Sequence, residues 1–307
     1  MSILMIEPIA FGFNVQTAAN NYFQQNDNSA AEEIQKKALQ EFTAMVEKLR
    51  EHKIDVIVVK DTPQPHTPDS IFPNNWVSFH EDGTVVLYPM FAENRRLERR
   101  EDILNHLQSI GYQINTIIDF SRYEKENLFL EGTGSMVLDK KNNVAYAALS
   151  QRTDEKVFEK FCQKMGFTPY SFSAFQTVGE ERLPIYHTNV IMCVADDYAV
   201  WCRDSIDDFQ ELIYVLDKLI CVGTGKEVVV ISEEQMHSFA GNMLQVENTE
   251  GKKYLVMSQT AYNSLDKEQL KTLKSFNDII TVEIPTIEKY GGGSARCMMA
   301  EVFLPKK

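Results

Sequence analysis

The stretch Trp76-Val77-Ser78-Phe79-His80-Glu81-Asp82-Gly83-Thr84-Val85-Val86-Leu87-Tyr88 holds two short apolar runs around a polar turn. An Asp-Gly turn between runs of β-branched and aromatic residues is typical of a β-hairpin. Later stretches repeat this pattern, each with a polar turn in the middle: residues 135–149, 190–202 and 243–257. The sequence therefore predicts four hairpins of similar size.

Helical patterns lie before, between and after these hairpins, and a further apolar run follows each helical segment. Apolar residues recur at a period near 3.6 in five segments: residues 30–51, 97–107, 156–165, 206–219 and 265–276. The strands predicted after them are residues 55–59, 113–118, 167–172, 227–231 and 279–284. A unit of hairpin, helix and strand thus recurs about every 50 to 60 residues, which is typical of a propeller or a solenoid. No linker rich in Pro, Gly or Ser divides the chain, so one α/β domain over residues 1–307 is predicted.

The composition excludes several classes of function. The chain has 307 residues, of which 44% are hydrophobic and 24% charged, as in ordinary globular proteins. Its net charge is -13 and it has no basic block, which argues against nucleic-acid binding. No run approaches the ~18 apolar residues of a membrane span. Residues 1–8 predict a first strand and not a signal peptide.

Cys297 is distinguished from the other cysteines by the segment Gly291-Gly292-Gly293-Ser294-Ala295-Arg296-Cys297, which precedes an apolar run over residues 298–304. Glycines let a backbone turn sharply and approach a ligand closely. Cys297 is therefore a candidate nucleophile, with a small buried apolar residue as the alternative interpretation. That second interpretation is kept for the other four: Cys162, Cys193, Cys202 and Cys221. The five cysteines of the chain are odd in number and have no paired spacing, which indicates free thiols in a reducing cytoplasm.

Two other segments supply what a reactive thiol needs, a base and a carboxylate that orients the base. His187 lies in Tyr186-His187-Thr188-Asn189, just before an apolar run. Glu131 lies between Leu128-Phe129-Leu130 and Gly132-Thr133-Gly134. The alternatives are a structural histidine and a turn acid that caps nearby amides.

The segment over residues 68–76 carries three polar side chains able to bind a ligand: Asp69, Asn74 and Asn75. An Asx-rich turn before a strand is the alternative. The sequence has no paired Cys or His motif for a metal, and its glycine runs lack the Lys-Ser/Thr of a phosphate loop. We therefore expect neither a metal nor an organic cofactor.

Together these four segments resemble the guanidino-group-modifying enzymes. That superfamily includes arginine deiminases, dimethylarginine hydrolases, amidinotransferases and succinylarginine dihydrolase. The similarity extends from residue 68 to Cys297, and it is nearest to the bacterial amidinotransferase-like branch, also labelled citrulline utilisation hydrolase. It implies a five-bladed α/β propeller with pseudo-fivefold symmetry, the pentein fold, which agrees with the repeat described above.

The resemblance also implies roles for individual residues. It gives three catalytic roles: the nucleophile to Cys297, the general acid/base to His187 and the carboxylate beside it to Glu131. At the position of Asp69, the dimethylarginine hydrolases hold the α-ammonium of the substrate. Two arginine segments hold its α-carboxylate, and they match residues 94–98, with Arg95 or Arg96, and residues 150–153, with Arg152. Bidentate pairing makes arginine suited to a carboxylate.

Two amides indicate the reacting group of the substrate. Many deiminases end the first motif with Asp, and arginine deiminases have a second acid two residues after the catalytic His. Here these positions are Asn75, preceded by Asn74, and Asn189. A buried guanidinium without a counter-charge is costly, whereas Asn can pair with a neutral urea through its N–H and C=O groups. The sequence therefore favours citrulline as the substrate, with ornithine, carbon dioxide and ammonia as products.

Several alternatives remain open. They are an arginine deiminase, a dimethylarginine hydrolase, an amidinotransferase to an amine acceptor, and a non-catalytic propeller that binds a ligand. The expected partner is a small amino-acid substrate, with neither nucleic acid nor membrane, and a homo-oligomer is an open alternative to a monomer. Residues 10–28, polar and rich in Asn and Gln, are predicted to form a lid over the site.

Overall fold

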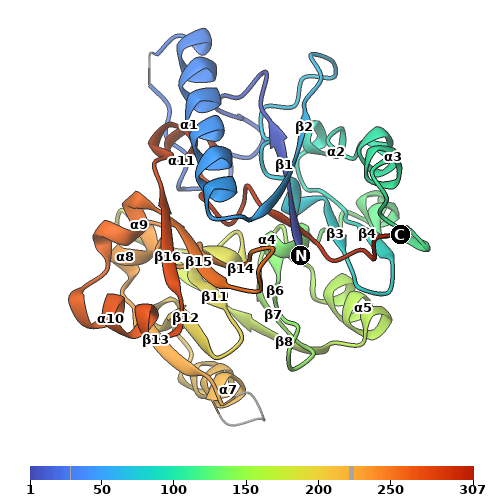
Figure 1. Ribbon diagram of the computed structural model, residues 1–307. Coiled ribbons are helices and arrows are strands. Elements are labelled where there is room, and N and C mark those ends of the chain that lie inside the picture. The colour runs from blue at the N-terminus through green and yellow to red at the C-terminus, as the bar shows by residue number, and fades with distance from the viewer. Residues whose placement is uncertain (28, 221–224) are drawn as a thin grey trace.

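Among residues 1–27, 29–220 and 225–307, which the computed structural model describes, five three-stranded sheets share one topology (Figure 1). Two predicted features, Cys221 and the last lid residue Asn28, lie outside the described residues. Four of the sheets are β3–β4–β5 (Val77–Phe79, Thr84–Leu87, Thr116–Asp119), β6–β7–β8 (Val137–Asp139, Val144–Leu149, Thr168–Ser173), β11–β12–β13 (Met192–Val194, Tyr198–Cys202, Glu227–Ile231) and β14–β15–β16 (Leu244–Glu247, Lys253–Ser258, Asp278–Val282). In each, the first two strands form an antiparallel hairpin and the third runs parallel to the second. The predicted hairpins and the α/β class are therefore confirmed.

The two ends of the chain build the fifth sheet. Strand β17 (Ala300–Val302) pairs antiparallel with β1 (Ser2–Glu7), which in turn runs parallel to β2 (Asp55–Lys60). This arrangement repeats the hairpin of the other sheets, although its two strands come from opposite termini. The sequence predicted both runs as strands, and burial of the apolar face of β1 accounts for their pairing.

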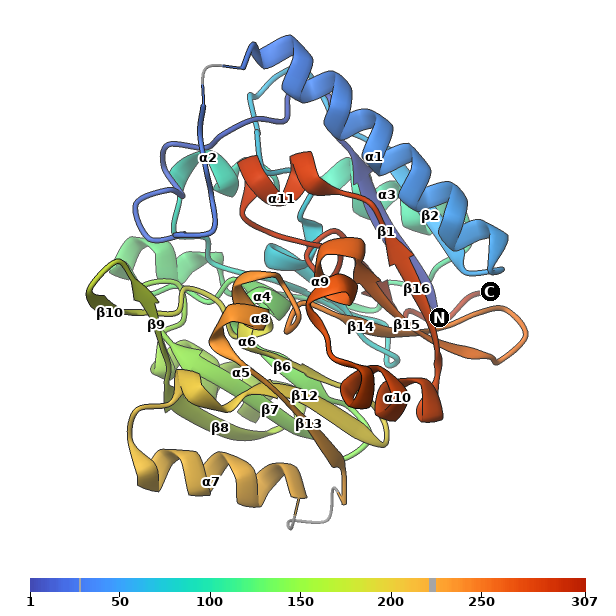
Figure 2. The ribbon, with the colours of Figure 1, turned by 90° about the vertical axis from the view of Figure 1, so that its left-hand side faces the viewer.

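A helix connects the second strand to the third in every sheet, because parallel neighbours need a crossover connection. These helices are α1 (Ala31–Glu51), α3 (Glu101–Ser109), α5 (Glu155–Met165), α7 (Phe209–Ile220) and α10 (Lys267–Phe276). Apolar side chains at helical spacing face inward, and in α1 they are Ile34, Ala38, Phe42, Met45, Val46 and Leu49. Figure 2 shows α1 lying along β1 and β2 on the outside of the molecule.

The structure differs from the sequence predictions in three places. The helix predicted over residues 97–107 begins only at Glu101, as α3, and a separate short helix, α2 (Glu93–Arg96), precedes the predicted range. Two residues expected to begin strands belong to short helical turns, Ser135 to α4 (Gly132–Ser135) and Val190 to α6 (Thr188–Ile191). An extra hairpin, β9–β10 (Phe175–Val178, Glu181–Pro184), turns at Gly179, whose φ is 63°. Within the described residues, no helix is both long and apolar enough to cross a membrane.

The connections that precede the first strand of each sheet lie against one another and position the site. Two glycines allow their close approach. A Cβ on Gly132 would lie 2.3 Å from the carbonyl oxygen of Asn74, and a Cβ on Gly241 would lie 2.1 Å from that of Val190. Any side chain at either glycine would therefore push neighbouring connections apart.

Candidate active site

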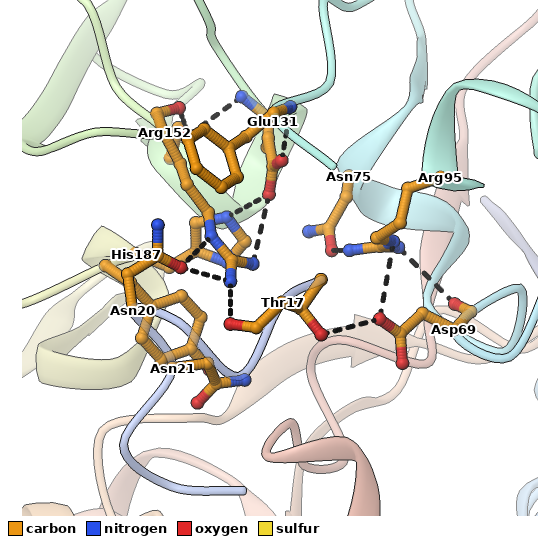
Figure 3. Close-up of polar contacts among 12 residues, drawn as sticks. Thr17, Asn20, Asn21, Asp69, Asn75, Arg95, Glu131, Arg152 and His187 are labelled. Carbon is orange, nitrogen blue, oxygen red and sulfur yellow. Dashed lines mark hydrogen bonds and ion pairs between the residues drawn. The ribbon is translucent and has the colours of Figure 1, made fainter. Parts of the chain in front are cut away.

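Three residues far apart in the sequence, Cys297, His187 and Glu131, come together beside one cavity. The Nε2 atom of His187 donates a hydrogen bond to Oε2 of Glu131 over 2.7 Å (Figure 3). Cys297 and His187 both line a small cavity of about 10 Å³. The second carboxylate oxygen of Glu131 accepts a hydrogen bond from the backbone N–H of Phe91 over 2.9 Å. A thiol and an imidazole that is hydrogen-bonded to a carboxylate therefore lie at one cavity, and these are the groups that nucleophilic catalysis by a thiol requires.

Burial and neighbouring charges set the protonation states of this group. Burial raises the pKa of Glu131, but the Arg152 guanidinium and the His187 hydrogen bond outweigh it and lower this pKa to about 2. Burial lowers the pKa of His187 to about 4, and Glu131 opposes this only in part. Glu131 is therefore a carboxylate beside a neutral imidazole. Because Nε2 donates its proton to Glu131, Nδ1 is the basic ring nitrogen.

Amide groups surround the thiol. Cys297 Sγ lies 3.4 Å from Nδ2 of Asn189 and 3.3 Å from Nδ2 of Asn242. The glycines before it let the loop pack on Phe72, since a Cβ on Gly291 would lie 2.7 Å from that ring. Sequence reasoning missed Asn242. The signal that could have found it is its position just before the first strand of its hairpin, where the other units carry site residues.

Asp69 has one occupied and one free carboxylate oxygen. Its Oδ2 accepts hydrogen bonds from Asn14 Nδ2 over 2.7 Å and from Thr17 Oγ1 over 3.2 Å. Its Oδ1 is buried without a hydrogen-bond partner, and the residue lines the cavity. Burial raises the pKa of this carboxyl group. A buried acceptor without a partner is suited to a ligand that brings an N–H donor.

Of the two candidate arginines in α2, Arg95 lines the cavity and Arg96 does not. Arg95 forms a bidentate pair with Glu98, with Nε and Nη2 each 2.9 Å from a carboxylate oxygen. Its Nη1 donates to Oδ1 of Asn75 over 2.7 Å. Arg96 instead donates to the backbone oxygens of two residues at the base of α2, Met90 and Phe91.

Arg152, in the second predicted arginine segment, also lines the cavity. Its Nη1 lies 3.5 Å from Oε2 of Glu131, its Nε donates to Oδ1 of Asn20 over 2.8 Å, and its Nη2 donates to the backbone oxygen of Thr17 over 2.8 Å. One guanidinium therefore connects the carboxylate of Glu131 with the segment predicted as a lid (Figure 3).

The three predicted asparagines differ in placement. Asn75 lines the cavity, whereas Asn74 lies behind it and accepts a hydrogen bond from Asn75 Nδ2 over 3.2 Å. Asn189 does not line this cavity: its Nδ2 lies 3.4 Å from the sulfur of Cys297, and its Oδ1 is buried without a hydrogen-bond partner.

Residues 10–27, the described part of the predicted lid, lie against the site. Its members Asn14 and Thr17 bond Asp69, and Asn20 bonds Arg152. Asn21 lines the cavity and donates to the backbone oxygen of Gly291 over 3.3 Å. Sequence reasoning identified the segment but not these contacts, because they depend on residues 50 to 270 positions away.

Comparisons with known proteins agree with this geometry. The family model for "N,N dimethylarginine dimethylhydrolase, eukaryotic" matches residues 7–304. No curated protein matches the sequence. The solved structure of ArgZ, an arginine dihydrolase from the ornithine-ammonia cycle in Cyanobacteria, is similar over 100% of this chain, with a TM-score of 0.75 and 17% identity. This chain spans 41% of the length of that one.

Two further solved structures match over nearly their full length. The N-terminal domain of ArgZ, covalently bound to a reaction intermediate, has a TM-score of 0.73 and 16% identity, with 99% of each chain covered. A dimethylarginine hydrolase (DDAH) from Pseudomonas aeruginosa, in complex with citrulline, has a TM-score of 0.62 and 13% identity, with 97% of this chain and 98% of that one covered. At these identities the similarity establishes a shared fold.

Proposed function

This chain belongs to the N,N-dimethylarginine dimethylhydrolase family of the guanidino-group-modifying superfamily, and from this membership we propose that it hydrolyses a C–N bond of a guanidino or ureido amino acid through a covalent intermediate on Cys297. The observation that carries the proposal is the 2.7 Å hydrogen bond between His187 and Glu131 beside the cavity that Cys297 also lines.

His187 exchanges protons at each step of the proposed reaction. Its Nδ1 removes the thiol proton of Cys297, and the thiolate attacks the planar carbon of the substrate. The imidazolium, stabilised by Glu131, then returns this proton to the leaving nitrogen, which departs as ammonia or an alkylamine. Water attacks the intermediate, a thiocarbamate from a ureido substrate or an amidino-thioether from a guanidino substrate, and gives a proton to His187. The C–S bond breaks, the product leaves, and His187 returns the proton to the thiolate. From citrulline the hydrolysis product is a carbamate, which loses carbon dioxide to give ornithine.

The polar groups around the cavity suit the α-amino acid end of the substrate. Asp69 Oδ1, buried without a hydrogen-bond partner, is the acceptor for the α-ammonium group. The guanidinium groups of Arg95 and Arg152 line the same cavity and are the donors for the α-carboxylate. The substrate is thereby held at one end, with its reacting carbon directed to the sulfur.

Amides at Asn75 and Asn189 support a neutral ureido group at the reacting end. Neither side chain brings a negative charge: Asn75 lines the cavity, and Asn189, which does not line it, places its Nδ2 3.4 Å from the sulfur. Citrulline is therefore the favoured substrate in this proposal, and its hydrolysis gives ornithine, carbon dioxide and ammonia.

The charge balance of the site favours a second candidate, arginine or a methylated arginine. Arg95 pairs with Glu98, and Arg152 lies beside Glu131, so these charges cancel in pairs. An ionised Asp69 then leaves one negative charge in excess, and its ion pair with Arg95 is long, at 3.9 Å. Burial raises the pKa of Asp69 and of Glu98, the latter to about 7, so this excess charge is costly without a cationic ligand. A substrate with a net charge of +1, such as arginine, would neutralise that excess better than the zwitterion citrulline.

A five-bladed propeller is part of the same proposal. Contacts between successive connections support it: Thr133 Oγ1 donates to Asn74 O, Thr188 Oγ1 to Ser135 O, Asn242 Nδ2 to Asn189 O and Arg296 N to Asn242 Oδ1. Contacts between β17 and β3 join the fifth sheet to the first. The five sheets thus follow one another in a ring of contacts.

The test is to measure ammonia release and amino-acid products from arginine, methylarginines, citrulline, agmatine and succinylarginine. Ornithine from citrulline supports the favoured substrate, and citrulline from arginine as the end product supports the second candidate. The Cys297→Ala variant should be inactive with every substrate. Turnover by this variant at the wild-type rate would refute the covalent route, and no turnover of any compound by the wild-type protein would refute the enzymatic function.

A further inference from the structure

Asn242, which precedes β14, contacts the sulfur of Cys297 with an amide whose orientation is fixed. Its side chain is buried, with 1% of its surface exposed. Its Oδ1 accepts a hydrogen bond from the backbone N–H of Arg296 over 3.1 Å, and its Nδ2 donates to the backbone oxygen of Asn189 over 2.9 Å. If the amide were flipped, its NH2 group would face the Arg296 N–H and its oxygen would face the Asn189 oxygen, and neither contact would be a hydrogen bond. Nδ2 is therefore the amide atom nearer to Sγ, at 3.3 Å, while Oδ1 lies 3.7 Å from Sγ and accepts from the thiol when it is protonated.

The other amide at the sulfur is less constrained. Asn189 Nδ2 lies 3.4 Å from Sγ, and its Oδ1 has no hydrogen-bond partner. Neither amide carries a charge, and His187 is neutral near pH 7 because burial lowers its pKa to about 4. A thiolate at Cys297 thus has two N–H donors beside it, of which Asn242 is the one held at both ends.

The position of Asn242 in the repeat agrees with a role in the reaction. Each sheet is preceded by a connection that brings a side chain to the site: Asn75 before β3, Glu131 before β6, His187 before β11 and Cys297 before β17. Asn242 occupies this place before β14. The fourth unit, which no sequence motif had assigned, thereby also contributes a side chain to the site.

We infer that Asn242 is a further catalytic residue, whose amide N–H stabilises the thiolate of Cys297 and holds the sulfur toward the cavity. The inference rests on the proposed role of Cys297 as nucleophile. A hydrogen bond to a charged atom lowers the pKa of the thiol when it favours the thiolate. Loss of such a bond corresponds to a rise of about 1 to 2 pH units.

The experiment measures alkylation of Cys297 by iodoacetamide across pH in the ligand-free protein, with the labelled peptide quantified by mass spectrometry. The variants are Asn242→Ala and the isosteric Asn242→Asp, which keeps an acceptor for the Arg296 N–H. The matched control is Asn248→Ala. Asn248 is also buried, and its side chain links backbone groups in the β14–β15 turn, including a 3.0 Å bond to His52 O, away from the cavity.

We expect the midpoint of alkylation to rise by about 1 to 2 pH units in Asn242→Ala. The rise should be larger in Asn242→Asp, where a carboxylate would repel the thiolate, and Asn248→Ala should show the wild-type midpoint. A wild-type midpoint in folded Asn242→Ala would overturn the inference. If that variant does not fold, the Asp variant decides in the same way. A purely structural role would lower the thermal stability of the variants without moving the midpoint.

This readout separates the inference from the proposed function, because alkylation needs no turnover. A shifted midpoint in a protein that hydrolyses none of the candidate substrates would support the thiolate contact and refute the hydrolase. Turnover that depends on Cys297, together with an unmoved midpoint, would refute the role of Asn242 alone.

Discussion

Oε2 of Glu131 lies 2.7 Å from Nε2 of His187, and this hydrogen bond joins the connection before β6 to the connection before β11. It determines which ring nitrogen carries the proton, since an ionised carboxylate accepts only from an N–H group. Nδ1 is then left as the basic ring nitrogen, which the proposed reaction uses for proton exchange. A contact between two units of the fold thus sets the chemistry of the site.

Replacement of the nucleophile should abolish turnover and leave the fold intact. In Cys297→Ala we expect kcat to fall by several orders of magnitude, because the covalent path is removed. The melting temperature should change little, since the alanine replaces a small buried side chain. Cys193→Ala, in which another buried thiol is removed from β11, should keep wild-type activity in the same ammonia assay.

Glu131→Gln should show how much the carboxylate beside His187 contributes to kcat while the imidazole itself is kept. The carboxylate raises the pKa of His187 against the effect of burial, so its loss should lower this pKa further below about 4. We expect kcat to fall by about 10²- to 10⁴-fold, the usual contribution of general acid–base catalysis. NMR titration of the imidazole and steady-state kinetics check both effects. Glu124→Gln, in which an acid paired with Arg99 outside the cavity is changed, should retain near-normal kcat.

Arginine-to-lysine variants should distinguish Arg95 from its neighbour Arg96. Lysine cannot reproduce the bidentate pair with Glu98 while also donating to Asn75. In Arg95→Lys we expect KM for arginine and citrulline to rise at least about tenfold, or ~1.4 kcal/mol. Agmatine, which has no α-carboxylate, should be affected less. Arg96→Lys should leave KM nearly unchanged, and an equal rise in both variants would contradict a carboxylate role for Arg95.

Acids in place of two amides should favour cationic substrates. In the double variant Asn75→Asp, Asn189→Asp, two carboxylates replace neutral groups beside the reacting carbon. The ratio of kcat/KM for arginine to that for citrulline should rise at least about tenfold, because burial of a guanidinium then has a counter-charge. A wild-type protein that already prefers arginine would refute citrulline as the substrate and leave the roles of Cys297 and His187 unaffected.

The buried His187 should make the protein less stable in mild acid. Its folded pKa is about 4, below the value of 6.5 for an exposed histidine. As the pH falls, the unfolded chain therefore binds a proton at His187 before the folded chain does. Above pH 6.5 this difference has no effect, and between pH 6.5 and 4 it lowers the free energy of unfolding. The loss is about 3 kcal/mol. Urea unfolding of wild type and His187→Asn at pH 7 and pH 4.5 should show a smaller pH effect in the variant, and equal effects would contradict the burial argument.

Local signals in the sequence predicted the elements and the chemical types. Asp-Gly and Asn-rich turns specify hairpins, and apolar residues at a period of 3.6 specify the crossover helices, because both depend on residues within a few positions of each other. The motifs around Glu131, His187 and Cys297 likewise identified the superfamily, which the family match confirms. The closer assignment to the citrulline utilisation hydrolase branch remains a prediction.

Other features depend on contacts that no local pattern encodes. The turn of Arg95 toward the cavity, and of Arg96 away from it, follows from the position of Glu98 and of nearby carbonyl groups on the folded chain. Asn242 carries no motif, and its contact with Cys297 spans 55 residues. The β9–β10 hairpin was also missed, since its short alternation is weaker than the helical and strand patterns on either side.

The sequence by itself determined the strands, the helices between them and the residues able to supply a thiol, a base and a carboxylate, because turn chemistry and hydrophobic periodicity act over short distances. Only the tertiary structure decided that the first and last strands share a sheet, which arginine enters the cavity and which amides reach the sulfur. These outcomes follow from the burial of apolar faces that are distant in the chain, and that packing brings the connections of successive sheets together around one site.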